Sequence, residues 1–205
     1  MTEESRENKR HQRHKRAMQK KKAFVDARIA EATIDKGLLI VLTGDGKGKT
    51  SSAFGTAIRS LGYGYKVAIV QFIKGEGECG ERNFLEQHPL VSYICMATGF
   101  TWETQDREAD TQAAKRAWQD AKKFLSDKSI HLVILDELTY MLKYGYLSEE
   151  EVFAALNQRS ENQHVIITGR SASKKLKNLA DTVSEVKAIK HAFDQGIKAQ
   201  KGIEW

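Results

Sequence analysis

Residues 38–52 read Leu38-Leu-Ile-Val-Leu-Thr-Gly-Asp-Gly-Lys-Gly-Lys-Thr-Ser-Ser52. The apolar run 38–42 predicts a strand buried on both faces, and a helical pattern begins at Thr50. Three glycines between them permit backbone conformations that a Cβ forbids, so successive N–H groups can turn toward one anion. The N-terminus of the following helix adds its own N–H groups and its dipole. This order of strand, loop, lysine and helix predicts a phosphate-binding P-loop.

The loop departs from the usual spacing G-x-x-x-x-G-K-[ST], because counting back from Gly48 places the first glycine at position 43, which is a threonine. Nucleotide binding is therefore expected, but the ordinary pose of the nucleotide is in doubt. Lys49 would neutralise phosphate, and the Thr50 hydroxyl could ligate a phosphate-bound Mg²⁺. The residues expected to bind the phosphates are Gly44, Asp45, Gly46, Lys47, Gly48, Lys49, Thr50 and Ser51.

The pattern after the loop predicts an α/β fold. A helix over 50–61 leads to a second apolar strand over 66–72, which makes a βαβ unit and therefore a parallel sheet. Further strands are expected near 91–96 and over 130–137, 164–168 and 182–189. We expect a mostly parallel sheet flanked by helices, of the P-loop NTPase-like (RecA-like) kind. The tail 191–205 should lie on the surface.

Paired carboxylates end the apolar run that begins at Ile130. Asp136 and Glu137 would lie at the carboxyl edge of the sheet beside the P-loop, where either could join Thr50 in holding Mg²⁺. The spacing does not decide between the two acids. In hydrolytic P-loop enzymes the second acid often activates water, so a P-loop NTPase or a small-molecule kinase that cleaves at the γ-phosphate remains an alternative.

Charge divides the chain into a basic N-terminal arm, 1–36, and a P-loop domain, 37–205. The net charge is +6, and residues 1–22 carry all of it, because the remaining acidic and basic residues cancel. A nucleic-acid groove on the domain is therefore not expected. The start of the arm would be partly disordered. Its later part has a narrow apolar stripe that either packs on its own domain or belongs to a mobile arm that caps a site: Met18, Val25, Ile29 and Ala32.

Location follows from what the sequence lacks. Two unpatterned cysteines, no apolar run of about 18 residues and no signal-like N-terminus predict a protein with no membrane segment in the reducing cytoplasm.

Residues 97–103 are expected to form a loop, and they include two large aromatic side chains, Phe100 and Trp102. Side chains two positions apart in an extended chain point the same way. They could belong to the core, or they could provide an apolar floor for a flat ligand near the nucleotide.

Several segments together resemble the CobA/BtuR-type ATP:corrinoid adenosyltransferases over about residues 24–205. The motifs that carry the resemblance are GDGKGKT from Gly44, VQFIKG from Val70, GERN from Gly80, MATGFTWET from Met96, LDELTY from Leu135, IITGR from Ile166, ADTVSE from Ala180 and KAQKGIEW from Lys198. The basic first twenty residues are the least similar part.

The resemblance implies transfer of the 5′-deoxyadenosyl group of ATP to the Co(I) of a reduced corrinoid such as cobalamin, with release of triphosphate, in cobalamin biosynthesis or salvage. It implies that ATP is held in reverse orientation, with Lys47 and Lys49 on the leaving group. It also assigns Mg²⁺ to Thr50 and Glu137, and gives Phe100 and Trp102 the place of the corrinoid's lower axial ligand. The expected partners are ATP, the corrinoid, an electron donor such as a flavoprotein, and a second copy in a homodimer.

A non-enzymatic reading also remains, namely a nucleotide-dependent binding module whose basic arm touches nucleic acid or an acidic partner. Only the charge of residues 1–22 supports it.

Overall fold

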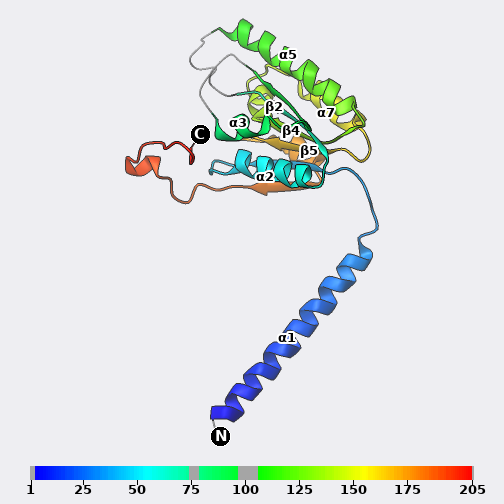
Figure 1. Ribbon diagram of the computed structural model, residues 1–205, viewed down its shortest axis with the longest axis vertical. Coiled ribbons are helices and arrows are strands. Elements are labelled where there is room, and N and C mark those ends of the chain that lie inside the picture. Colours follow the sequence, from blue (N-terminus) through cyan, green and yellow to red (C-terminus); the bar gives the residue numbers. More distant parts are fainter. Residues whose placement is uncertain (1–2, 74–78, 97–105, 205) are drawn as a thin grey trace. The chain divides into compact units, whose positions relative to one another are not determined.

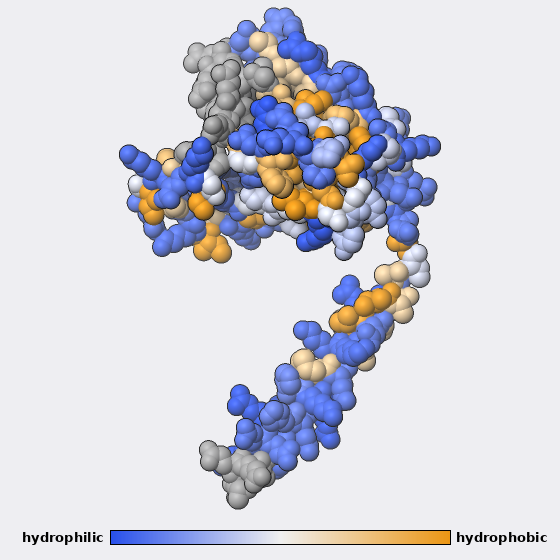
Figure 2. All heavy atoms as spheres, viewed as in Figure 1, coloured by the Kyte–Doolittle hydropathy of each residue, from blue (hydrophilic) through white to orange (hydrophobic). Residues whose placement is uncertain are grey.

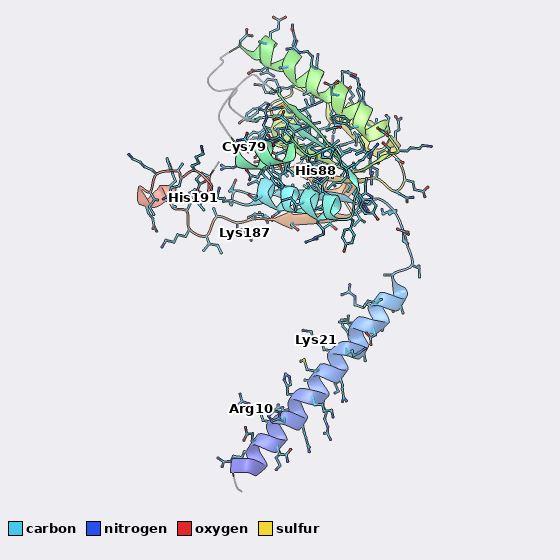
Figure 3. The ribbon with its side chains drawn as sticks, viewed as in Figure 1. Arg10, Lys21, Cys79, His88, Lys187 and His191 are labelled. Carbon is cyan, nitrogen blue, oxygen red and sulfur yellow. The ribbon has the colours of Figure 1, made fainter. Side chains whose placement is uncertain are left out.

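A computed structural model describes residues 3–73, 79–96 and 106–204 of the chain, in two units, Met1–Asp35 and Lys36–Trp205. The first unit is one helix, α1 (Glu3–Glu31), whose described side chains from Arg6 onward are exposed. Its surface is mostly hydrophilic, with apolar side chains such as Met18 and Ile29 interrupting it (Figure 2). Arg10 and Lys21 project from it (Figure 3).

The second unit is built on a six-stranded sheet in which every pairing is parallel, in the order β3-β2-β4-β5-β1-β6 (Figure 1). All carboxyl ends of the strands therefore meet at one edge of the sheet. The predicted α/β class with a parallel sheet is confirmed. The strands are β1 (Leu39–Thr43), β2 (Lys66–Gln71), β3 (Val91–Cys95), β4 (Ile130–Asp136), β5 (His164–Thr168) and β6 (Thr182–Glu185).

Helices cover both faces of this sheet. On one face, α2 (Lys49–Gly62) and α3 (Gly80–Leu85) bury Phe54 and Leu85 against the strands. The other face is covered by α5 (Arg107–Ser126), α6 (Leu138–Lys143), α7 (Glu149–Gln158) and α8 (Lys174–Leu179). Alternate residues of β1 enter the two cores, Leu39 and Val41 in one and Ile40 and Leu42 in the other, as the continuous apolar run predicts.

Two elements differ from the sequence prediction. The helix α6 was not foreseen, because only Glu137 separates it from the end of β4 and it is only six residues long. The expected strand 182–189 ends at Glu185, and all four of its residues are exposed at the sheet edge. Directly after β6, the backbone of Val186 forms hydrogen bonds with Thr43 and Gly46 at the P-loop. A short 3₁₀ helix, η1 (Phe193–Gln195), follows.

The amino edge of the sheet is tied together by Gln163, which is 2% exposed. Its amide nitrogen donates to the carbonyl oxygens of Phe124, Asp127 and Ile130 at 3.0, 3.1 and 3.0 Å. One side chain thereby joins the end of α5 and the starts of β4 and β5.

We predict that Gln163→Leu lowers the free energy of unfolding by about 1–3 kcal/mol, because buried carbonyl oxygens lose a donor. Urea unfolding monitored by circular dichroism measures the change. Gln158→Leu, at an exposed position of α7, is the matched control and should change stability by less than about 0.5 kcal/mol. Equal stability of the two variants would contradict the role given to Gln163.

Candidate functional site

The P-loop connects β1 to α2, and two of its three glycines lie directly against another backbone segment. A Cβ on Gly44 would lie 2.4 Å from the carbonyl oxygen of Val186, and one on Gly46 would lie 2.7 Å from the backbone of Lys187. The N–H of Gly46 donates to Val186 O at 2.8 Å, so this N–H is not turned to an anion as the sequence analysis expected. Gly48 has a φ of 116°, which favours glycine, immediately before α2 begins.

Asp136 lies at the centre of the carboxyl edge and is 2% exposed. Its Oδ1 accepts hydrogen bonds from the hydroxyls of Thr50 at 2.8 Å and Thr168 at 2.6 Å. Its Oδ2 accepts from the amide nitrogen of Gln71 at 2.8 Å. A single carboxylate therefore joins the first turn of α2 to the ends of β2 and β5.

Glu137 follows Asp136 in the left-handed conformation, with a φ of 57°, which costs a residue with a side chain about 1–2 kcal/mol. Its backbone N–H donates to the Thr168 hydroxyl at 3.0 Å. Gly169 provides the space beside it, since a Cβ there would lie 3.0 Å from Glu137 Oε2 and 2.0 Å from the Thr139 hydroxyl. The sharp turn aims the Glu137 carboxylate differently from that of Asp136.

The Glu137 carboxylate is the perturbed acid of the site. Burial is the main reason that its pKa rises to about 7, and the negative charge of Asp136 adds to the shift. The cations Lys49 and Arg170 oppose it. Its Oε2 atom is buried and has no hydrogen-bond partner among the described residues. A buried carboxylate oxygen without a hydrogen-bond partner is available to bind a cation.

Lys49 is largely buried, 7% exposed, and its Nζ donates to the carbonyl oxygen of Gly46 at 2.8 Å. Burial lowers the pKa of its ammonium group, while the nearby Glu137 opposes this. The lysine is thus held back onto its own loop, close to the unpartnered acid.

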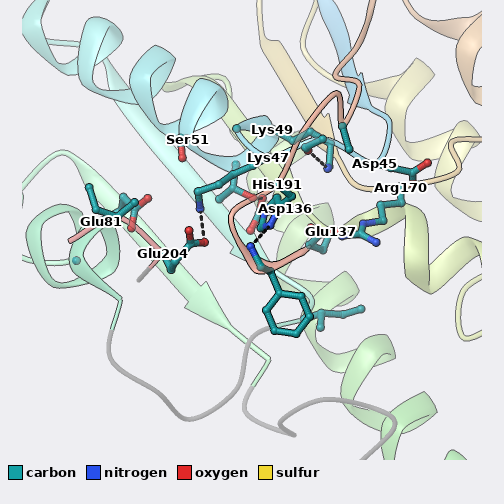
Figure 4. Close-up of a pocket in the computed structure, with 18 of the residues that line it drawn as sticks. Asp45, Lys47, Lys49, Ser51, Glu81, Asp136, Glu137, Arg170, His191 and Glu204 are labelled. Atoms are coloured by element: carbon teal, nitrogen blue, oxygen red, sulfur yellow. Dashed lines mark hydrogen bonds and ion pairs between the residues drawn. The ribbon is translucent and has the colours of Figure 1, made fainter. Parts of the chain in front are cut away.

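These residues line a cavity of about 910 Å³ (Figure 4). Its inner wall comes from the P-loop, Gln71, Asp136, Glu137 and Arg170. Its outer wall comes from the C-terminal segment, which contributes Ala188, His191, Phe193, Asp194, Gly202, Ile203 and Glu204. Figure 3 shows Lys187 and His191 on this segment.

The tail 191–205 lies on the surface, as predicted, and it also forms part of the cavity wall, which the sequence analysis did not predict. Its described side chains are mostly exposed, yet Glu204 Oε2 lies 2.8 Å from Lys47 Nζ across the cavity (Figure 4). The segment reaches the cavity because Val186 and Lys187 pack on Gly44 and Gly46 of the loop. These positions are about 140 residues apart, so no local sequence pattern predicts the contact.

The structure places every predicted phosphate-binding residue from Asp45 to Ser51 on the cavity wall, together with Asp136 and Glu137. Gly44 lies behind the wall, against Val186. Phe100 and Trp102 lie outside the described residues. Sequence reasoning gave no role to Gln71 or Thr168. Their signal was position, since both are polar residues at the carboxyl end of a buried parallel strand.

The side-chain oxygens at this edge of the sheet fit a magnesium ion that is also bound by phosphate oxygens of a nucleotide. The Thr50 hydroxyl donates its hydrogen to Asp136, which leaves its lone pairs available, and Glu137 Oε2 is buried without a partner. Asp136 already accepts three hydrogen bonds. Among the described residues, no group of three or more His, Cys, Asp or Glu side chains could hold a metal ion, so an ion here would also need oxygen atoms of the bound nucleotide or of water.

A wholly parallel sheet, a glycine-rich loop that leads from a buried strand into a helix, and carboxylates at a neighbouring strand end together define a P-loop nucleotide-binding α/β protein. Residues 35–205 match the family described as ATP:corrinoid adenosyltransferase BtuR/CobO/CobP, and the chain belongs to this family.

Similar proteins agree with this assignment. The chain is 55% identical over 194 residues to the "Corrinoid adenosyltransferase" of Escherichia coli (strain K12) and to the "Corrinoid adenosyltransferase CobA" of Salmonella typhimurium (strain LT2), covering 95% of this chain and 98% of each relative. The predicted resemblance, and with it membership of an enzyme family of transferases, is confirmed. A solved RadB recombinase has 18% identity and a TM-score of 0.45 over 75% of this chain and 76% of its own, a likeness too weak to bear on function. Among the described residues, no helix is both long and apolar enough to cross a membrane.

We predict that Glu204→Gln strengthens ATP binding about two- to threefold, because a partly exposed ion pair worth less than about 1 kcal/mol no longer competes for Lys47. Isothermal titration calorimetry measures the affinity. Glu161→Gln, exposed and outside the cavity lining, should leave it unchanged. Weaker ATP binding by Glu204→Gln would show that the carboxylate supports the nucleotide instead of competing with it.

Proposed function

We propose that the cavity holds ATP and presents its ribose C5′ to a corrinoid reduced to Co(I), so that the 5′-deoxyadenosyl group is transferred and triphosphate leaves. The observation that carries the proposal is a P-loop cavity of about 910 Å³, lined by Lys47, Lys49 and Glu137, in a chain of this family. That volume lies within the range usual for small-molecule sites.

In this reaction the electron pair of Co(I) forms the cobalt–carbon bond, and the C5′–O bond breaks with its electrons going to triphosphate. Cobalt supplies the nucleophile, so no protein base is required. The protein's task is to stabilise charge that grows on the leaving triphosphate, and preorganised cations and N–H groups do this effectively in a site shielded from water. Lys47 and Lys49, which line the cavity, and the N-terminus of α2 would supply this stabilisation.

Mg²⁺ would be held by Thr50 and Glu137, with Asp136 positioning Thr50 and not ligating directly. The unpartnered Glu137 Oε2 and the three hydrogen bonds at Asp136 support this division. The ion would neutralise part of the charge on the phosphates. The chain's own residues bind and orient it, and Lys49 would leave Gly46 for a phosphate oxygen.

The remaining parts of the proposal rest on the family resemblance. Phe100 and Trp102 would contact the lower face of the corrinoid in place of an axial ligand, which favours four-coordinate Co(II) and eases its reduction. The arm 1–36 would cap the site with its apolar stripe. A homodimer, a flavoprotein electron donor and a cytoplasmic location complete the proposal.

A product assay tests the reaction. With Mg-ATP and chemically reduced cob(I)alamin, we expect light-sensitive adenosylcobalamin and an equal amount of triphosphate. Lys49→Ala should abolish both products by removing a buried cation from the loop. ADP or orthophosphate with an unchanged corrinoid spectrum would instead show the alternative, cleavage at the γ-phosphate.

We predict that Trp102→Ala and Phe100→Ala each slow adenosylation of cob(II)alamin by about tenfold or more, since each removes an apolar contact worth about 1.5–3 kcal/mol when buried. ATP affinity should stay the same. Steady-state rates with a chemical or enzymatic reductant measure the effect, and Phe84→Ala, an exposed aromatic on α3, is the control. Unchanged rates in both variants would mean that the two aromatics belong to the core.

A further inference from the structure

Along the inner wall of the cavity, a chain of side-chain hydrogen bonds runs from Tyr93 on β3 to Thr50 on the P-loop helix. The Tyr93 hydroxyl donates to the Gln71 carbonyl oxygen, and the Gln71 amide nitrogen donates to Asp136 Oδ2 at 2.8 Å. Asp136 in turn accepts from Thr50 at 2.8 Å. Gln71 is completely buried and Asp136 is 2% exposed, so water cannot readily replace a lost partner.

Gln71 is the link in this chain whose orientation matters. Its amide has a donor end and an acceptor end of nearly equal shape, and only the donor end is compatible with a carboxylate. Tyr93 fixes this choice, because its hydroxyl supplies a hydrogen to the acceptor end. Burial raises the pKa of the Tyr93 phenol, so the hydroxyl keeps the hydrogen that it donates.

The orientation is passed on to Thr50 through Asp136. With Gln71 on Oδ2, the other oxygen of Asp136 takes the hydroxyl hydrogens of Thr50 and Thr168. Thr50 then directs its lone pairs away from Asp136. A reversed Gln71 amide would place an oxygen against Oδ2, and the carboxylate would have to move or lose its hold on Thr50.

We propose that Tyr93 and Gln71 are positioning residues for the metal-bound nucleotide, acting through Asp136 and Thr50 without touching the metal themselves. This inference rests on the proposed function, because it takes Thr50 as a magnesium ligand. It assigns to β2 and β3 a role in the Mg²⁺-dependent part of ATP affinity, although β3 is the edge strand farthest from the P-loop strand in the sheet order.

The test compares ATP binding by isothermal titration calorimetry in excess Mg²⁺ and in EDTA. Tyr93→Phe should weaken MgATP binding about fivefold, the effect of one buried hydrogen bond, and leave metal-free ATP binding unchanged. Gln71→Met, which keeps the length of the side chain and removes both polar ends, should do the same. Tyr146→Phe, which removes the same hydroxyl from a residue outside the cavity lining, is the control.

The ratio of the two affinities separates positioning from a structural effect, because a merely destabilised protein loses both kinds of binding together. If this ratio is the same in both variants as in the wild type, the inference is overturned, whether both affinities stay unchanged or both fall by the same factor. If wild-type protein binds ATP equally well in Mg²⁺ and in EDTA, the magnesium site of the proposed function fails, and the inference fails with it. If wild type shows the Mg²⁺ effect and the variants keep it, only the inference fails.

Discussion

The buried carboxylate of Asp136 is the interaction on which the site depends. It accepts hydrogen bonds from α2, β2 and β5 at the one edge where all the strands of the parallel sheet end. A buried charge is tolerated only when such donors satisfy it. The requirement therefore fixes the first turn of the helix after the P-loop relative to the sheet, and it leaves Glu137, turned away by its left-handed backbone, as the acid with an unpartnered oxygen.

The shortened P-loop packs against the segment that follows the edge strand β6. β6 pairs with β1, and the residues that follow it lie directly on Gly44 and Gly46. Backbone packed on backbone leaves no room for side chains, so these glycines permit the close approach of a second segment. The same approach carries the C-terminal segment over the cavity, where Glu204 reaches Lys47. The loop and the tail thus form one site.

Local patterns predicted much of this molecule. Apolar runs that end in turn residues gave the strands, and in a βαβ chain their parallel order places each strand end at one edge. That rule places Thr50, Asp136 and Glu137 at the same edge of the sheet, but how close they lie depends on the strand order. The order of the strands does not follow from it. β5 lies between β1 and β4, and this is a matter of how the helices divide between the two faces, which involves side chains from the whole chain.

The sequence by itself determined the parallel α/β class, the glycine-rich loop between a strand and a helix, and the family, because each depends on residues close together in the chain or on short motifs. Only the tertiary structure decided which acid is saturated and which has an unpartnered oxygen, that Gln71 and Thr168 hold Asp136, and that the tail walls the cavity. These features arise from hydrogen bonds and close approaches between segments that are distant in sequence, and the energy of such contacts depends on burial, which no local pattern specifies.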